Sequence, residues 1–167
     1  MNADRPETTV GDARGAPVSE AAIALIAKWE GFRSAAYLCP AGVPTIGYGT
    51  THYEGGEPVR LGDVITAPAA MQLMRKEVAS YARRVDVLVK VPLTHGERGA
   101  LVSFVYNLGA GALAESTLLR LLNGGRRAEA AAQFSRWNKA RVGGELTPMD
   151  GLTRRRAEEA AMFGGDT

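Results

Sequence analysis

The chain has 167 residues, of which 46% are apolar and 23% charged, and its formal net charge is +2. This length predicts a single domain with enough apolar content for a packed core. The charge is mild, and basic and aromatic residues are not interleaved on a recognisable module, which argues against nucleic-acid binding. No window holds the ~18 apolar residues of a membrane-spanning helix, so we expect no stable membrane insertion. A single cysteine excludes an internal disulfide, and Cys39 is therefore either buried filler or a reactive group.

Residues 1–18 are rich in charged residues, Pro, Gly and Thr and contain little to bury, so we expect a flexible leader. A single domain is expected over residues 19–167. Its first helix begins after Ser19, a suitable N-cap, and carries apolar residues at helical spacing. Gly31 is expected to end this helix, which leaves Glu30 at its last position.

Glu30 has the features expected of a proton donor. The negative end of the helix dipole and burial by neighbouring aromatic residues would both disfavour the ionised carboxylate. A carboxyl group that keeps its proton near neutral pH is suited to general acid catalysis.

The segment after Glu30 predicts a small hairpin. Residues 37–39 and 45–48 flank the turn sequence Pro-Ala-Gly-Val-Pro, and a short third strand is expected at 59–61. In this arrangement Cys39 ends one strand and Thr45 begins the next. One acid, one thiol and one hydroxyl are thus expected to converge on a single groove.

The rest of the chain predicts helices. A long helix is expected from Thr66 until Pro92 closes it, with a Met and Val stripe that indicates core contact. Thr94 and Glu97 have capping-box spacing before an almost wholly apolar helix that Gly109 ends. Shorter helices are expected over 116–122 and 126–137, a loop over 142–147, and a last helix with Thr147 as its N-cap that reaches residue 163.

These elements predict an α+β architecture, in which a small β lobe and a larger helical lobe are joined by the long helix. The boundary between two such lobes is the expected ligand cleft. Residues 120–156 carry nine Lys or Arg against three acids. This excess is consistent either with a solvated helix face or with attraction to an anionic polymer such as a bacterial envelope.

Several segments, in one order, resemble the phage-type lysozymes of glycoside hydrolase family 24. The motif is Glu, eight residues, Asp or Cys, five residues, Thr, and the resemblance continues through SFVYNLGAG, STLLRLLN, RWNKA and GLTRRRAEEAAMF. It implies a lysozyme-like fold and an endolysin that hydrolyses the β-1,4 bond between N-acetylmuramic acid and N-acetylglucosamine in peptidoglycan, lysing the host cell.

By the same resemblance, Glu30 is the general acid, Cys39 holds the place usually filled by Asp, and Thr45 helps to position water. Asn107 and Arg155 match positions that approach the cleft and bind substrate. A glycosidase needs an acid for the leaving oxygen and a second group for the opposite side, a requirement that Glu30 and Cys39 would meet.

Two features depart from the family pattern. His often follows TIGYG directly, whereas Thr50 and Thr51 stand before His52 here, so a support of the hairpin is expected to be missing or shifted. The second departure is the thiol, because an unperturbed Cys with a pKa of ~8.5 is only a few per cent thiolate at neutral pH.

Other classes of protein remain as alternatives. A cysteine peptidase cutting the peptide stems would use Cys39, His95 and Asn107, although Cys39 precedes a turn and not a helix. A zinc amidase is disfavoured because two His and one Cys show no ligand spacing, and we expect neither metal nor cofactor. The third alternative is not an enzyme: a module that binds the cell wall and whose catalytic site has decayed, for which the missing His is the only indication.

The expected partner is peptidoglycan, and the expected state is a monomer. With no signal pattern at the N-terminus, the protein is expected to accumulate in the host cytoplasm and to reach the periplasmic wall only after a separate holin has permeabilised the membrane.

Overall fold

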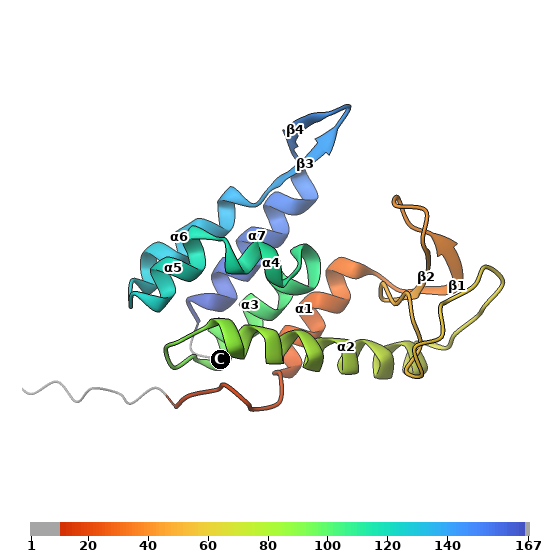
Figure 1. Cartoon of the computed structure of the whole chain (residues 1–167), viewed down its shortest axis with the longest axis horizontal. Helices are drawn as coiled ribbons and strands as arrows, with labels where there is room; N and C mark the ends of the chain where they lie inside the picture. Colours follow the sequence, from red (N-terminus) through yellow and green to blue (C-terminus); the bar gives the residue numbers. More distant parts are fainter. Residues whose placement is uncertain (1–10, 166–167) are drawn as a thin grey trace, which may run out of the picture.

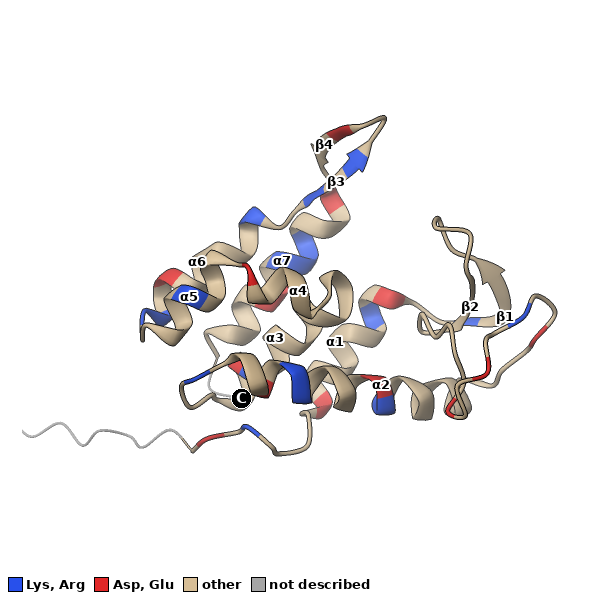
Figure 2. Cartoon of the chain, viewed as in Figure 1, with Lys and Arg blue, Asp and Glu red and all other residues tan. Residues whose placement is uncertain are grey.

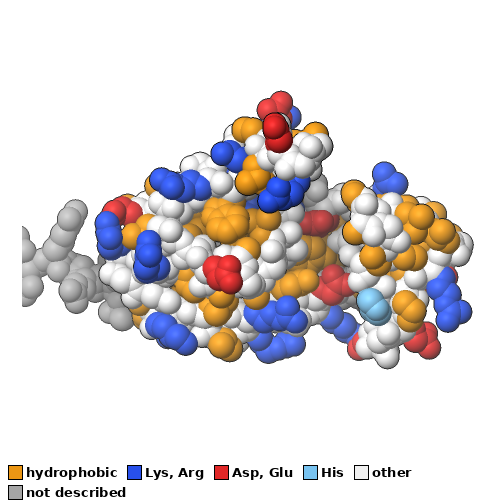
Figure 3. Space-filling view, turned by 45° about the horizontal axis from the view of Figure 1, so that its top comes forward, with side chains coloured by type: hydrophobic (Ala, Val, Ile, Leu, Met, Phe, Trp, Pro, Cys, Tyr) orange, Lys and Arg blue, Asp and Glu red, His pale blue; other side chains and the backbone are white. Residues whose placement is uncertain are grey.

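The structure, a computed structural model, describes residues 11–165. It has the expected α+β architecture: a small β lobe lies at one end, a helical lobe at the other, and the long helix α2 runs between them (Figure 1). In the space-filling view the surface is indented between the two lobes, and acidic side chains lie at this indentation (Figure 3).

Helix α1 (Glu20–Glu30) and the first hairpin form as the sequence predicts. The Ser19 hydroxyl accepts a hydrogen bond from the backbone of Ala22, and Gly31 ends the helix with a φ of 69°. Strands β1 (Arg33–Leu38) and β2 (Pro44–Gly47) then pair antiparallel, with Tyr37 opposite Thr45. The third strand expected at 59–61 does not form, because this part of the loop makes only isolated bridges with its neighbours.

Helices α2 (Ala67–Leu88) and α3 (His95–Leu108) build the centre of the molecule. Thr66 caps α2, and the predicted capping box at the start of α3 is present, with Thr94 and Glu97 each bonding the other's backbone. Residues 96–105 of α3 are all buried. In its interior Phe104 packs edge-to-face against both Phe134 and Trp137, so this helix is the buried core of the helical lobe, as expected.

The C-terminal third differs from the prediction in detail. The expected helix over 126–137 is shorter and ends in a 3-10 turn, and the expected loop over 142–147 is a hairpin that projects from the helical lobe (Figure 1). Gly143 and Gly144, with φ of 58° and 91°, make the two-residue turn that joins its strands. The elements are α4 (Ala110–Ala114), α5 (Thr117–Asn123), α6 (Arg127–Gln133), the 3-10 helix η1 (Phe134–Arg136), β3 (Lys139–Val142), β4 (Glu145–Pro148) and α7 (Asp150–Phe163).

The start of α7 also corrects the sequence-based assignment. Thr147 was expected as the N-cap, but it belongs to β4, and the N-cap position is held by Met149 without a side-chain hydrogen bond. Since the pairing of β4 with β3 continues through Pro148, the chain is extended where a helical turn was predicted.

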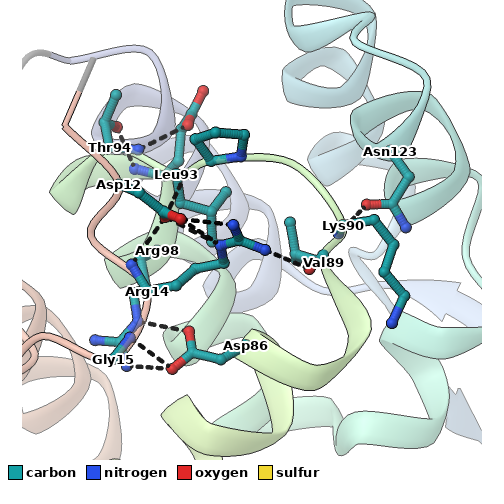
Figure 4. A network of polar contacts seen from close by, with 12 residues as sticks. Asp12, Arg14, Gly15, Asp86, Val89, Lys90, Leu93, Thr94, Arg98 and Asn123 are labelled. Carbon is teal, nitrogen blue, oxygen red and sulfur yellow. Dashed lines mark hydrogen bonds and ion pairs between the residues drawn. The ribbon is translucent and has the colours of Figure 1, made fainter. Parts of the chain in front are cut away.

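Residues 12–16 belong to the folded domain, which corrects the boundary expected at Ser19. Ala13 and Leu93 are joined by a backbone hydrogen bond, and Arg98 donates to the carbonyl of Ala16. The Asp12 carboxylate pairs with Arg14 and accepts from the backbone of Leu93 (Figure 4). The rest of the expected leader, residues 1–10, lies outside the described part of the chain.

None of the helices in residues 11–165 combines the length and the apolar character that a membrane crossing requires.

Candidate active site

Glu30 lies where α1 meets the β lobe, and its carboxylate is held from the opposite lobe. Its Oε1 accepts a hydrogen bond of 2.8 Å from Nη1 of Arg155 in α7, and its side chain is 21% exposed. The other carboxylate oxygen faces Gly49 in the turn after β2, where a Cβ atom would come within 3.6 Å of it. The sequence did not indicate this ion pair, because residues 30 and 155 are joined only by the tertiary fold.

Arg155 was expected to bind substrate, but the structure gives it a different position. Its side chain is only 4% exposed, so it offers little surface to a ligand. Besides Glu30, its guanidinium group contacts the buried carboxylate of Glu159 at 3.2 Å and the Ser103 carbonyl at 3.3 Å. The Ser103 hydroxyl also donates to Glu159, at 2.7 Å. Arg155 is therefore a rigid support that orients the carboxylate of Glu30.

Asn107, the other expected substrate residue, is exposed at the C-terminal end of α3. Its side-chain oxygen accepts a hydrogen bond of 2.7 Å from Arg156, which is fully buried. Burial lowers the pKa of Arg156 to about 10, against the opposing effect of Glu159. The Arg-rich segment thus divides into two groups. Arg155 and Arg156 are buried, whereas Arg120 on α5, Lys139 and Arg141 on β3 and Arg154 on α7 are exposed. Figure 2 shows where these basic positions lie along the ribbon.

Cys39 and Thr45 lie together at the turn end of the first hairpin. The thiol is half-buried and is surrounded by hydrogen-bond donors: the backbone N–H groups of Val43 and Ala41 and the Thr45 hydroxyl lower the pKa of Cys39 below its ordinary value. Thr45 is buried, and its single hydroxyl proton lies 2.9 Å (oxygen to oxygen) from the Val43 carbonyl, so this proton is shared between that carbonyl and the thiol. Because the lowered pKa favours the charged form, a larger fraction of Cys39 is thiolate at neutral pH than in an unperturbed cysteine.

The turn that follows β2 is tied to the helical lobe by residues that the sequence analysis did not single out. The Tyr106 hydroxyl contacts both the Tyr48 carbonyl at 2.9 Å and the Glu77 carboxyl at 3.0 Å. Thr50, at the place where the resemblance implied a His, is buried beside them. The sequence signalled this cluster only through the Thr at residue 50. Glu77 and Tyr106 lie in helices that the sequence marks by the spacing of their apolar residues, and that spacing does not single out either polar group.

The constellation of a cysteine peptidase is not assembled. His95 opens α3 and Asn107 lies near its other end. Twelve residues of helix separate them by about 18 Å. The three residues of that alternative cannot therefore share one catalytic centre.

Two lobes joined by a long helix, with a carboxyl group at the end of the first helix facing the boundary between them, are the features of the lysozyme-like glycoside hydrolases. Comparison with known proteins makes the assignment specific: the phage lysozyme family model matches residues 27–159. The chain belongs to the phage lysozyme family and is a glycoside hydrolase that cleaves peptidoglycan.

Individual relatives agree with this assignment. The chain is 42% identical to the endolysin of Acyrthosiphon pisum secondary endosymbiont phage 1, over 87% of this chain and 97% of that protein. Among solved structures, the endolysin from Escherichia coli O157:H7 phage FAHEc1 is 37% identical, with a TM-score of 0.83 and coverage of 90% and 94%. The muramidase domain of SpmX from Asticaccaulis excentricus is also 37% identical, with a TM-score of 0.81 and coverage of 89% and 97%.

Proposed function

We propose that this chain is an endolysin that hydrolyses the β-1,4 bond between N-acetylmuramic acid and N-acetylglucosamine, with Glu30 as the general acid. The observation that supports this role is the position of the Glu30 carboxyl, which lies between the lobes and is oriented by the buried Arg155. A proton donor must be held within hydrogen-bonding reach of the glycosidic oxygen, and a fixed carboxyl group meets that requirement.

In the proposed reaction Glu30 gives its proton to the glycosidic oxygen as the bond to the anomeric carbon breaks. Cys39 acts on the other side of the sugar, either as the base that takes a proton from the attacking water or as the nucleophile that bonds to the anomeric carbon. Thr45, in contact with the thiol, helps to position that water. Asn107 is proposed to contact the sugar, since its side chain is exposed and is fixed by Arg156.

Cys39 is proposed to replace the carboxylate of the usual Glu, Asp, Thr set. The donors from the turn that follows it, Ala41 and Val43, favour the charged thiolate over the neutral thiol. A thiolate is the form needed for either role, because only it can accept a proton or attack carbon.

The test of Glu30 is Glu30→Gln, which keeps the size of the side chain but removes the acidic proton. Turnover on purified peptidoglycan should fall by ~10²-fold or more, the scale of general acid catalysis. Circular dichroism must show that the variant is folded. A folded Gln variant with near-native turnover would remove Glu30 from the mechanism.

Mass analysis of the digested peptidoglycan tests the reaction itself. Free reducing N-acetylmuramic acid ends are expected. Anhydro ends would indicate a lytic transglycosylase, cut stems a peptidase, and intact glycan a wall-binding module, and each of these results would contradict the proposal.

The role of Cys39 is tested by two substitutions compared at equal folded concentration. Cys39→Asp should be active, because a carboxylate can serve as base or nucleophile, and Cys39→Ala should be inactive. A buried packing residue would give the opposite order, since an alanine would be tolerated and a buried charge would be costly.

We also propose that the enzyme acts as a monomer and reaches the periplasmic wall from the host cytoplasm once a separate holin has opened the membrane. One relative, 36% identical over 87% of both chains, is named a SAR-endolysin, so the release route is tested directly. Expressed alone, the protein should leave cells intact until chloroform is added. Spontaneous lysis without a membrane-disrupting partner would refute this route.

A further inference from the structure

The two lobes are joined beside Glu30 by a cluster of three polar groups. Tyr106 comes from α3, Glu77 from α2, and Tyr48 from the turn after β2. The Tyr106 oxygen lies 2.9 Å from the carbonyl oxygen of Tyr48 and 3.0 Å from Oε2 of Glu77. The rings of Tyr81, from α2, and Tyr106 pack edge-to-face with their centroids 5.3 Å apart, which adds an apolar contact between α2 and α3 next to the cluster.

The number of protons available for hydrogen bonding in this cluster indicates the protonation state of Glu77. A phenol has one proton to donate, and the Tyr48 carbonyl can only accept. If Glu77 were ionised, two acceptors would compete for the single Tyr106 proton. If Glu77 is a neutral carboxylic acid, it donates to Tyr106, Tyr106 donates to Tyr48, and each group has a partner.

The surrounding charges favour the neutral form. Burial raises the pKa of Glu77, and the negative charge of Glu30 raises it further, whereas the hydroxyls of Thr50 and Tyr106 lower it. The basic neighbours on α2 are engaged elsewhere, Arg75 with Glu20 and Lys76 with Glu54. Within residues 11–165, no basic side chain forms an ion pair with Glu77.

Thr50 shows why the cluster takes this form here. Thr50 is buried next to Glu77 and brings only a neutral hydroxyl, which makes no well-formed hydrogen bond among the described residues. An acid without a facing cation is more stable when it keeps its proton.

We propose that Glu77 is a positioning residue for the reaction, which as a neutral carboxylic acid bonds Tyr106 and thereby holds the turn at Tyr48–Thr50 against the helical lobe. The turn matters because it lines the space beside the Glu30 carboxylate: a Cβ atom added at Gly49 would lie 3.6 Å from Oε2 of Glu30. A shift of this turn changes the space around the general acid. The inference rests on Glu30 being the acid, as proposed above.

The experiment compares Glu77→Gln and Glu77→Ala with the natural enzyme. The Gln side chain has the size of the neutral acid and keeps a donor for Tyr106, so it should restore turnover at saturating peptidoglycan. The Ala variant leaves the turn unsupported and should lower kcat by about 10-fold or more with little change in KM, because a displaced acid affects the chemical step. Tyr106→Phe should resemble Glu77→Ala, and the two changes combined should cost less than the product of the single effects.

The pH profile separates a neutral Glu77 from an ionised one. An ionised Glu77 would help Glu30 keep its proton, so replacing it by Gln would move the alkaline limb of the kcat profile to lower pH. With a neutral Glu77 this shift is absent and the limb of the Gln variant stays in place, because one neutral group replaces another. A shift to lower pH, or loss of kcat in Gln equal to that in Ala, overturns the proposal.

Thermal unfolding gives a readout that does not depend on activity. A group with a raised folded pKa contributes stability that is present below its unfolded pKa and is lost as pH rises through the folded pKa. From about pH 4 upward, the ordinary pKa of Glu, the natural enzyme should therefore lose stability relative to Glu77→Gln. A gap in Tm between the two that stays constant with pH overturns the proposal. Glu57→Gln, an exposed acid of the β lobe, is the matched control and should show no such trend.

If Glu30→Gln proves active, the assignment of the acid fails, whereas the Tm measurements still decide the protonation of Glu77.

Discussion

Replacing Arg155 by Ala should destabilise the protein and inactivate it together. The guanidinium group contacts Glu30, Glu159 and Ser103, and its side chain is 4% exposed while that of Glu159 is fully buried. The substitution therefore leaves a buried acid with one of its two basic partners removed. Only Arg156, at 3.2 Å, remains to pair with Glu159.

The magnitude follows from the burial of this pair. Removing one partner of a buried ion pair costs about 3–5 kcal/mol, and the remaining Arg156 argues for the lower end of that range. For a protein of this size each kcal/mol lowers Tm by about 2–4 °C, so a loss of ~3 kcal/mol corresponds to about 6–12 °C. Turnover should fall as well, because the carboxyl of Glu30 loses its orienting contact.

Differential scanning calorimetry at neutral pH measures the first effect and peptidoglycan hydrolysis the second. The matched control is Arg126→Ala, which removes an arginine that is 59% exposed and pairs with the equally exposed Glu129. Its Tm should be unchanged, since exposed pairs contribute little. If Arg155→Ala has the Tm of the control, the buried network does not stabilise the fold; if it keeps native turnover below its Tm, Arg155 does not orient Glu30.

Three further predictions concern the scaffold. Gly99→Ala should lower Tm although Ala favours helices, because the added Cβ would lie 2.7 Å from the Cβ of Ala22 and force α1 and α3 apart; an increase in Tm would contradict this close packing. Thr94→Ala removes a helix cap and should cost about 1 kcal/mol in urea unfolding, so a loss below the error of the measurement would show the cap to be dispensable. The Arg14 side chain lowers the pKa of Asp12, so the stability it brings is present above the ordinary Asp pKa and is lost as pH falls through the lower folded value. Asp12→Asn should accordingly unfold more readily than the natural enzyme at pH 7 and lose that difference in acid, and an equal difference at both pH values would exclude the ion pair as the cause.

Features that depend on neighbours in the chain were predictable. The caps at Ser19, Thr66 and Thr94 use a side chain to bond a backbone group three residues away, so the local pattern carries the information. The first hairpin was predictable for the same reason. The second hairpin, with its Gly143-Gly144 turn, also has a local signal, but its strands are short and exposed and lack the alternating apolar pattern that marks a buried strand.

Features that depend on distant segments were not predictable. Residues 12–16 have the composition of a flexible leader, and only the neighbouring ends of α2 and α3 supply the partners that hold them. Arg155 belongs to a run of basic residues that reads as a solvated surface, and only the crossing of α7 with α3 and α1 buries it.

The sequence by itself determined the class of this protein, because several of its motifs resemble, in one order, those of the phage-type lysozymes. The tertiary structure alone decided how the acid Glu30 is held. Four helices supply the residues of this site: Glu30, Glu77, Tyr106 and Arg155. Their ion pair and hydrogen bond span only about 3 Å in space, although the residues lie far apart along the chain. Local patterns record which residues can form a helix or a turn, whereas the partner of each buried charge is chosen when the helices pack.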